Sequence, residues 1–507
     1  MSGLQDRHVL VLGLGLSGLA MARWCAAQGA QVTVADTREA PPQLDALRAA
    51  VPEARFVGGA LDAALLDDAS LRAVYRSPGL APVAIASVVD AARARGLPVR
   101  GELDLFNQAL AELAQQRDYR PALLAITGTN GKTTVTALTG QLVERTGRSV
   151  VVAGNIGPTL LDTLQARLQA QELPEVWVLE LSSFQLDASE GFEPTAATVL
   201  NLTQDHLDWH GDMAAYAAAK ARVFGDTGVM VLNRNDSQVI AMRPAAPVKG
   251  AKGLKQVPRS VLTFGADMPA APGDFGIEVV GGMAWLVRAQ EADETQRRRK
   301  DADEELHIQR LMPADALRIR GRHNAVNALA ALALASSAGC ALGPMLYGLR
   351  EYRGEPHRVE SIGLLESVEY FDDSKGTNVG ATVAALEGLG AERKLVVILG
   401  GDGKGQDFSP LRAPVSRFAR AAVLIGRDAP QLRAALAGAG VALIDARDMA
   451  DAVAQARGRA HPGDAVLLSP ACASLDMFRN YAERADAFRA AVRDLALDAG
   501  TELELLA

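Results

Sequence analysis

ITGTNGKTT at residues 126–134 is a glycine-rich turn followed directly by Lys132 and two threonines. Small residues let successive backbone N–H groups converge on phosphate oxygens, while Lys132 supplies positive charge and the Thr133 hydroxyl can ligate Mg²⁺. ALLAIT before the turn reads as a buried strand, and VTALTGQLVERTG after it as an amphipathic helix. The stretch predicts a loop for ATP or a similar nucleotide, in a variant that has Ile126 where the standard phosphate-loop pattern has glycine.

Short apolar runs alternate with alanine-rich helical stretches along the chain. The runs are bounded by glycine and lack polar–apolar alternation, so helices should cover both faces of each sheet. The predicted fold class is therefore α/β with mostly parallel sheets. The predicted strands are HVLVLG, QVTVAD, LLAIT, VVVAG, VWVLEL, AATVLN, GVMVLN, KLVVILGG, AAVLIG and DAVLLSP.

A second glycine-rich turn, GLGLSG at residues 13–18, joins the first predicted strand to a helix, and Asp36 ends the next strand. This pattern is the dinucleotide-binding fingerprint, which by itself would favour an NAD-dependent oxidoreductase. Physically, it requires only a diphosphate at a helix N-terminus and a carboxylate near a ribose-like hydroxyl, and a nucleotide sugar meets both requirements. The separate loop at residue 126 favours two different nucleotides. A turn that only packs strand against helix is the structural alternative.

The length of 507 residues predicts three domains at about 100 to 200 residues each. We expect a Rossmann-like domain at 1–101, a central phosphate-loop domain at 102–354, and a second Rossmann-like domain at 355–507. The last boundary rests on GEPHR, which should open a new βαβ series. Between Gln290 and Glu305, QEADETQRRRKDADEE has mixed charge and no apolar face, and predicts a solvated insertion.

Composition limits the functional class. A net charge of −8 argues against a nucleic-acid binder, which would normally carry a basic face. Three widely spaced cysteines without a CxxC pair predict a reduced, cytoplasmic protein without disulfides or zinc. The N-terminus enters a strand directly, and no run of 18 uncharged apolar residues occurs, so we expect neither export nor a membrane span. Without a long apolar heptad pattern, the chain should be a monomer.

Three residues, each at a predicted strand end or early in a helix, could hold a metal ion and activate an electrophile. Glu180, in VLELSSFQL, offers the hard oxygen ligands that Mg²⁺ prefers. His206, with its acidic neighbours in NLTQDHLDWH, fits either a ligand set or a capping and hydrogen-bonding cluster. Lys220, in the alanine-rich YAAAKARVF, reads by itself as a solvated surface lysine.

A set of motifs spanning nearly the whole chain resembles the Mur ligase family. The motifs are TGTNGKTT, GNIG, ELSSFQL, NLTQDHLDWH, GRHNAVNALAA, EPHRVE, DDSKGTN, GGDGKGQDF and SPACASLDMFRNY. The resemblance implies a three-domain, ATP-dependent amide ligase of peptidoglycan precursor synthesis, in which phosphorylation turns a carboxylate into an acyl phosphate that an amine attacks. Within the family, it implies UDP-N-acetylmuramoyl-L-alanine as the carboxylate and D-glutamate as the amine.

The resemblance also implies roles for matching residues. Catalysis would rest on Lys132, Glu180, His206 and Lys220. ATP would be held by Gly128, Thr129, Asn130, Gly131, Lys132, Thr133, Thr134, Asn324 (adenine), Arg358 and Asp373. Two Mg²⁺ ions would be held by Thr133, Glu180, His206 and a carbamylated Lys220. The UDP-sugar would contact Leu16, Ser17, Asp36, Thr37, Arg38, Ser77 and Asn155. Glutamate would contact Lys375, Thr377, Lys404, Ser474, Leu475 and Tyr481.

Alternative functions stay open at the level of sequence. A sibling ligase that adds another amino acid would share the ATP-binding core, and the pocket around Lys404 and Ser474 would discriminate it. An NAD-dependent oxidoreductase and a non-catalytic nucleotide-binding scaffold are the other candidates. Residue types do not specify the handedness of the glutamate. Since ATP contacts are expected from two domains, closure about hinges near Gly101 and Gly354 should accompany turnover.

Overall fold

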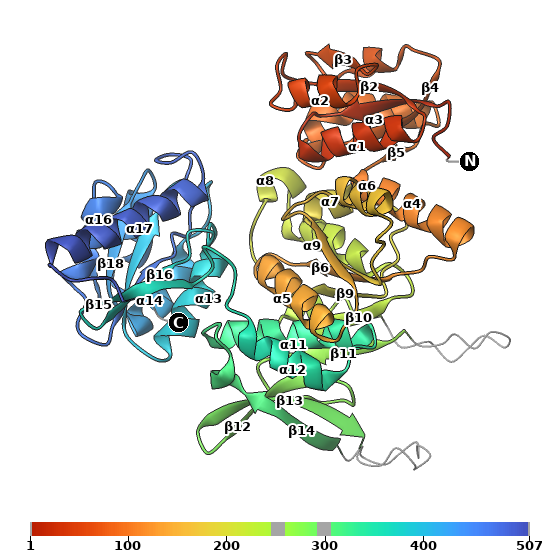
Figure 1. The fold of residues 1–507 in the computed structure, drawn as a ribbon. Coiled ribbons are helices and arrows are strands. Elements are labelled where there is room, and N and C mark those ends of the chain that lie inside the picture. The colour runs from red at the N-terminus through yellow and green to blue at the C-terminus, as the bar shows by residue number, and fades with distance from the viewer. Residues whose placement is uncertain (1–2, 245–258, 292–305, 505–507) are drawn as a thin grey trace. The chain divides into compact units, whose positions relative to one another are not determined.

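The computed structural model describes residues 3–244, 259–291 and 306–504 (Figure 1). The fold is α/β and contains parallel-rich sheets, as the sequence predicts. The chain divides into two compact units. The first contains residues 1–202, 206–264 and 330–345, and the second contains 203–205, 265–329 and 346–507. Among the described residues, no helix combines the length and apolar character that a membrane crossing requires.

The first sheet is entirely parallel, with strand order β3-β2-β1-β4-β5. Its strands are β1 (His8–Leu12), β2 (Gln31–Asp36), β3 (Arg55–Gly58), β4 (Leu71–Arg76) and β5 (Val99–Arg100). Its helices are α1 (Leu16–Ala27), α2 (Leu44–Ala50) and α3 (Pro82–Ala94). Because the strand order reverses at β1, the loop that follows β1 lies at the switch point where such sheets bind ligands. This loop is the GLGLSG turn.

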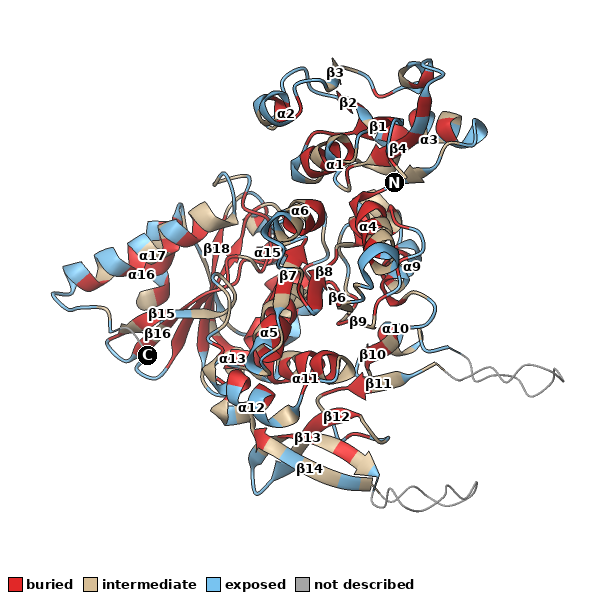
Figure 2. Ribbon diagram, turned by 45° about the vertical axis from the view of Figure 1, so that its right-hand side comes forward, coloured by how far each residue is buried: buried red, intermediate tan, exposed pale blue. Residues whose placement is uncertain are grey.

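The phosphate loop follows a central strand of the first unit's second group of parallel strands, ordered β11-β10-β9-β6-β8-β7. The strands are β6 (Ala122–Thr127), β7 (Val150–Gly154), β8 (Val176–Glu180), β9 (Ala196–Val199), β10 (Val229–Asn233) and β11 (Val261–Phe264). The helices are α4 (Glu102–Arg117), α5 (Lys132–Arg145), α6 (Leu160–Ala170), α7 (Ser183–Asp187), α8 (Leu207–His210), α9 (Met213–Ala221) and α10 (Ser237–Ile240). Every residue of β8 and β9 is buried, as expected for strands covered on both faces (Figure 2).

The second unit begins with an antiparallel group that the sequence did not reveal: β12 (Phe275–Val280), β13 (Met283–Glu291) and β14 (Leu306–Pro313). Gln290 and Glu291, predicted to open a solvated insertion, instead complete β13. The rest of that charged segment lies outside the described residues. Two helices follow along the chain, α11 (Arg322–Ser337) and α12 (Leu342–Glu351), and the second unit contains only part of each.

The third sheet has the order β15-β16-β20-β17-β18-β19. Only the pairing of β15 with β16 is antiparallel, and the other neighbouring strands are parallel. Its strands are β15 (Glu360–Leu365), β16 (Val368–Asp372), β17 (Leu395–Gly400), β18 (Ala419–Ile425), β19 (Ala442–Asp445) and β20 (Ala465–Leu468). Its helices are α13 (Val379–Gly390), α14 (Arg412–Phe418), α15 (Ala429–Leu436), α16 (Met449–Arg457) and α17 (Tyr481–Asp498). The prediction that GEPHR opens a βαβ series was wrong, because an antiparallel hairpin of β15 and β16 comes first.

Candidate functional site

The predicted phosphate loop is a turn between β6 and the N-terminus of α5. Gly128 and Gly131 have φ angles of 149° and 82°, which side-chain-bearing residues rarely adopt. The ammonium of Lys132 donates hydrogen bonds of 2.8 Å to the carbonyl oxygens of both Gly128 and Thr129. The lysine charge therefore lies over the loop whose N–H groups, together with the helix N-terminus, form an anion site.

Two residues that the sequence analysis missed hold this loop in place. The Asn201 carbonyl oxygen accepts from the Thr129 N–H at 2.9 Å, and its side chain exchanges hydrogen bonds of 2.8 and 3.0 Å with the backbone of Asn130. The Tyr216 hydroxyl lies 3.2 Å from Thr129 Oγ1. Asn201 is the second residue after β9, and this position beyond a parallel strand end was the available signal.

Glu180 ends β8 and is only 1% exposed. Its Oε1 accepts a 2.8 Å hydrogen bond from the Asn155 side chain, and its carbonyl oxygen accepts one from the Asn155 N–H. Its Oε2 is buried without a hydrogen-bond partner. A buried carboxylate oxygen in this state costs free energy unless a ligand uses it. The donor set fits the predicted magnesium site, because Mg²⁺ takes carboxylate oxygens.

Lys220 is buried, with 2% exposure, so the interpretation of this residue as a solvated surface lysine was wrong. Its ammonium donates to the Gly128 carbonyl oxygen at 2.9 Å and to Thr127 Oγ1 at 3.3 Å. It also lies 4.7 Å from the centre of the Tyr216 ring. The helix α9 thus turns Lys220 toward the phosphate loop, a direction that an alanine-rich sequence does not reveal.

His206 lies in an aromatic group beside α7. It has a left-handed backbone with φ of 54°, precedes α8, and places its ring 4.8 Å from that of Phe184. The ring of Trp209 lies 4.7 Å from Phe184, and His210 Nε2 lies 2.9 Å from Ser183 Oγ. Burial lowers the pKa of His210. His206 is exposed, so it can face a ligand.

In the predicted sugar-nucleotide site, Asp36 organises the GLGLSG turn. Its Oδ2 accepts a 2.7 Å hydrogen bond from the Leu14 N–H, and Arg38 binds both carboxylate oxygens at 2.8 and 2.9 Å. The Arg38 side chain, together with backbone hydrogen bonds, lowers the pKa of Asp36 to about 2. A Cβ on Gly18 would lie 1.9 Å from the Gly13 carbonyl oxygen, so only glycine permits this packing of helix on strand.

The remaining predicted sugar contacts lie around the same turn. Ser77 is buried and donates to the Gly13 carbonyl oxygen at 3.1 Å. Leu16 and Thr37 are exposed. Ser17 lies near the buried carboxyl group of Glu102, a residue that sequence reasoning missed, and acts to lower its pKa. The turn after β1 therefore lies near the start of α4.

Glu102 makes a pH-dependent contribution to stability. It is 2% exposed, its Oε1 accepts from the Leu161 N–H at 3.1 Å, and its Oε2 has no hydrogen-bond partner. Burial raises its pKa from 4.5 to about 7. Between these pH values the folded chain holds a proton that the unfolded chain has released, so ionisation weakens the fold as pH rises.

We therefore expect Glu102→Gln to gain stability relative to the parent as pH rises from about 4.5 to 7, by up to about 3 kcal/mol, with no further gain above pH 7. Urea unfolding at a series of pH values would measure the difference. Glu112→Gln, on the same helix but only half-buried, is the matched control. A pH-independent difference for Glu102→Gln would contradict the assignment.

In the second unit, Asn324 and Arg358 line one cavity of about 390 Å³. Arg318, Arg320 and Arg353 also line it. Asn324 is 7% exposed and donates to the Arg320 carbonyl oxygen at 2.8 Å. These guanidinium groups, which suit phosphate, share the lining with Glu355, Glu360 and Glu369. The residues predicted at the adenine and the phosphates thus meet at one cavity.

Asp373 lies directly after β16 and is 6% exposed. Its carboxylate accepts a 2.7 Å hydrogen bond from the Ser469 hydroxyl. Burial raises the pKa of Asp373 to about 7, and the nearby charge of Arg358 acts in the opposite direction. The predicted ribose and phosphate residues therefore influence each other electrostatically.

The loops predicted to bind glutamate are joined to one another. Asp402, in the GGDGKG loop, exchanges backbone hydrogen bonds of 2.9 and 2.8 Å with Ala473, in the SPACASLD loop. Arg484, missed from sequence, is 1% exposed and donates to the carbonyl oxygens of Ser374 at 2.7 Å and Cys472 at 3.0 Å. Burial lowers the pKa of Arg484 to about 10. These bonds bring the DDSKGTN, GGDGKG and SPACASLD loops together.

The predicted glutamate contacts differ in exposure. Ser474 is buried, Lys375 and Thr377 are half-buried, and Lys404 and Leu475 are exposed. Lys375 Nζ lies 5.4 Å from the centre of the Tyr481 ring. Cationic and hydroxyl groups of this kind are suited to binding carboxylates.

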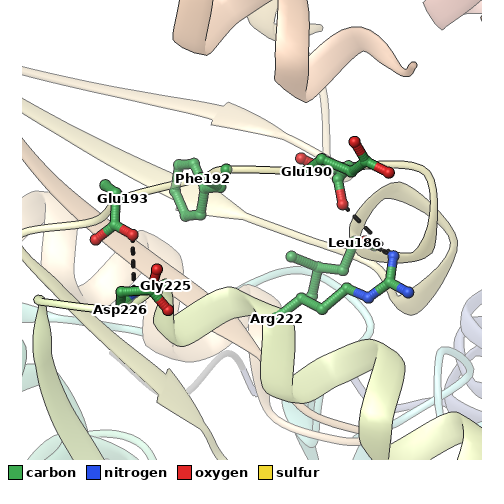
Figure 3. A pocket seen from close by; sticks show the side chains of 9 residues that line it. Leu186, Glu190, Phe192, Glu193, Arg222, Gly225 and Asp226 are labelled. Carbon is green, nitrogen blue, oxygen red and sulfur yellow. Dashed lines mark hydrogen bonds between the residues drawn. The ribbon is translucent and has the colours of Figure 1, made fainter. Parts of the chain in front are cut away.

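A further cavity of about 350 Å³ is lined by none of the predicted site residues (Figure 3). Its lining includes Glu190, Glu193 and Arg222, and the last two make local hydrogen bonds. Arg222 donates to the Asp187 carbonyl oxygen at 2.8 Å, and Glu193 accepts from the Asp226 N–H at 2.8 Å. These contacts join the segment before β9 to the segment before β10.

Comparison with known proteins agrees with the resemblance. Family models match for the MurD-like N-terminal domain at residues 7–101, the Mur ligase middle domain at 126–335, and the glutamate ligase domain at 357–472. A UDP-N-acetylmuramoylalanine–D-glutamate ligase of Albidiferax ferrireducens is 68% identical over 504 residues, covering 99% of both chains. A protein of the same name from Burkholderia mallei is 59% identical, covering 98% of this chain and 99% of its own.

Solved structures share the fold at low sequence identity. The UDP-N-acetylmuramate-alanine ligase of Thermotoga maritima aligns with a TM-score of 0.52 and 18% identity, covering 97% of this chain and 99% of its own. MurF from Acinetobacter baumannii aligns with a TM-score of 0.53 and 18% identity, covering 92% and 88%. Given the full-length relatives and the three matching domains, the chain belongs to the Mur ligase family.

Proposed function

We propose that this enzyme joins UDP-N-acetylmuramoyl-L-alanine to D-glutamate, with ATP converted to ADP and phosphate, in the synthesis of peptidoglycan precursors. The observation that carries the proposal is the 68% identity, over 99% of both chains, to a relative named for that reaction. The buried Glu180 and Lys220 around the phosphate loop support it, because a nucleotide-binding scaffold does not need these groups.

A carboxylate resists attack by an amine until one of its oxygens becomes a leaving group, and transfer of phosphate to form an acyl phosphate provides this. In our proposal, Lys132 and the N–H groups of residues 128–134 hold the phosphates, while Thr133, Glu180 and His206 hold two Mg²⁺ ions. The ions would neutralise the charge that develops on the transferred phosphoryl group. The chain's own contribution is to orient the γ-phosphate toward the substrate carboxylate.

We also propose that Lys220 carries a carbamate. Its burial disfavours a cation at this position, and addition of CO₂ to the amine would place an anion there that can hold Mg²⁺. The Glu180 oxygen without a hydrogen-bond partner supports a cation site at the end of β8.

Three domains, at 1–101, 102–354 and 355–507, are part of the proposal, with the UDP-sugar bound by the first and glutamate by the last. The ranges of the three family models support these boundaries. A monomer and a cytoplasmic location remain predictions. Cys25, Cys340 and Cys472 are free thiols, which fits a reducing compartment.

The direct test is ADP release, measured by chromatography, with ATP, Mg²⁺, UDP-N-acetylmuramoyl-L-alanine and one amino acid at a time. We expect ADP with D-glutamate and only background with L-glutamate. Release with another amino acid would assign the chain to a sibling ligase. Absence of release with every amino acid would contradict the proposal and return attention to the oxidoreductase alternative.

A further inference from the structure

An ionic network surrounds the buried carboxylate of Asp372 at the end of β16. Asp372 is fully buried, and its Oδ2 lies 2.7 Å from His357 Nδ1. The same oxygen accepts hydrogen bonds from Arg489 Nε at 3.3 Å and Nη2 at 3.1 Å. Its Oδ1 accepts from the Ser374 N–H at 2.9 Å. Removing the guanidinium would leave a buried anion short of its cationic partner, which is costly.

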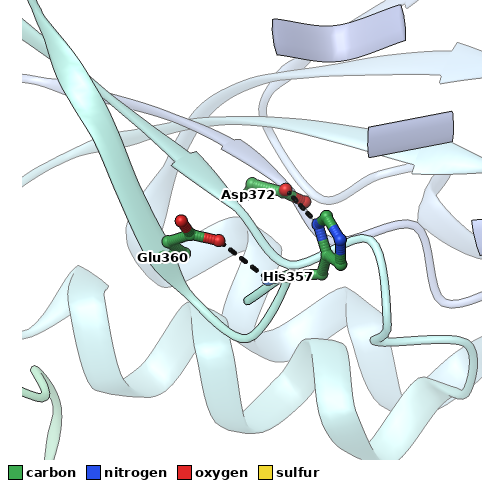
Figure 4. Close-up of side chains that lie close together, drawn as sticks. All are labelled: His357, Glu360 and Asp372. Atoms are coloured by element: carbon green, nitrogen blue, oxygen red, sulfur yellow. Dashed lines mark hydrogen bonds and ion pairs between the residues drawn. The ribbon is translucent and has the colours of Figure 1, made fainter. Parts of the chain in front are cut away.

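Arg489 joins this carboxylate to a second one. It lies on α17, and its guanidinium also pairs with Glu360 at the start of β15. Glu360 Oε2 in turn accepts a 2.9 Å hydrogen bond from the His357 N–H. Asp372 therefore holds the ring of His357, and Glu360 holds its backbone (Figure 4).

His357, Glu360 and Asp372 lie close enough together to suggest a cation site, with ligand atoms within 4.8 Å of one another. The guanidinium of Arg489 already supplies positive charge to both carboxylates. An ion-pair network explains the cluster without a metal.

The network adjoins residues that are proposed to bind ATP and residues that are proposed to bind glutamate. His357 has a φ of 63°, and its neighbour in sequence is Arg358; Asp373 follows Asp372. The His357 carbonyl oxygen accepts from the Lys375 N–H at 3.2 Å, and its ring lies 5.9 Å from that of Tyr481, edge to face. The strained backbone at His357 needs external support, which the two carboxylates supply.

We propose that Arg489 is a positioning residue, which fixes His357 through Asp372 and Glu360 and thereby places Arg358 and Asp373 for ATP and Lys375 for glutamate. The inference rests on the proposed function, because these ligands are the ones that function requires. None of the residues predicted from sequence lies on α17 beyond its first position, Tyr481.

The test compares Arg489→Ala, Arg489→Lys and the matched control Arg493→Ala, an exposed arginine on the same helix. In Arg489→Ala we expect the KM values for ATP and for D-glutamate to rise about tenfold, with kcat changed much less, because the lost contacts orient binding groups. Arg489→Lys should recover part of this loss. Arg493→Ala should match the parent enzyme.

A purely structural role would lower the amount of active enzyme, and hence kcat, while leaving both KM values unchanged; that result would overturn the inference. Parent-like KM values in Arg489→Ala would do so as well. Calorimetric titration with ATP and Mg²⁺ provides a readout that does not need the amino acid, and we expect about tenfold weaker ATP binding in Arg489→Ala. If the parent released no ADP with D-glutamate, the proposed function would fail while this titration still decided the role of Arg489.

Discussion

Lys132→Ala should reduce ADP release by at least about 10³-fold, because the phosphoryl group would lose a charge placed where negative charge develops. The Lys132 ammonium donates hydrogen bonds of 2.8 Å each to two carbonyl oxygens of its own loop. The loop is also held by Asn201 and Tyr216, so the fold should survive the substitution. ADP release under saturating substrates measures the effect.

Lys394→Ala provides the control for this experiment. Its ammonium likewise donates a 2.8 Å hydrogen bond to a carbonyl oxygen, that of Arg417, but on an exposed surface of the second unit. We expect parent-like ADP release from it and unchanged thermal unfolding in both variants. Substantial ADP release from a folded Lys132→Ala enzyme would exclude the assigned role of the phosphate loop.

The sequence predicts those features of the site that local patterns determine. The phosphate loop requires glycines at positive φ, an adjacent lysine and a following helix, and all of these are continuous in residues 126–134. The ten predicted strands are likewise continuous apolar runs, and each corresponds to a strand in the structure. Local patterns suffice here because a backbone at positive φ favours glycine, and burial on both faces of a strand favours a continuous apolar run.

Features that depend on distant partners escaped prediction. Lys220 is buried because α9 packs toward Thr127 and Gly128, which lie far away in sequence. Arg484 and Glu102 are charged residues that tertiary packing places at 1% and 2% exposure. Composition alone predicts exposure for such residues, since unpaired charges are rarely buried. The hairpin of β15 and β16 was missed for a related reason, because strand direction depends on pairing rather than on apolar content.

Lys220→Ala should lose at least about 10²-fold in ADP release if the carbamate holds a metal ion, since loss of one electrostatic group in a closed site has this magnitude. Short carboxylic acids such as formate or acetate should restore part of the activity, because they can place a carboxylate in the space that the side chain leaves. Lys220→Met, which fills that space, should resist the restoration. ADP release across a series of carboxylate concentrations measures both effects.

A carbamate also has a signature that does not depend on turnover. The parent enzyme, equilibrated with ¹³C-labelled bicarbonate, should show a carbamate carbon resonance that is absent from Lys220→Ala and retained in Lys132→Ala. Buried as it is beside the Gly128 carbonyl oxygen, Lys220 is shielded from bulk water, which should slow loss of the adduct. If the resonance were missing from the parent and carboxylates failed to restore Lys220→Ala, Lys220 would act instead as a buried cation that fixes the phosphate loop through Gly128 and Thr127.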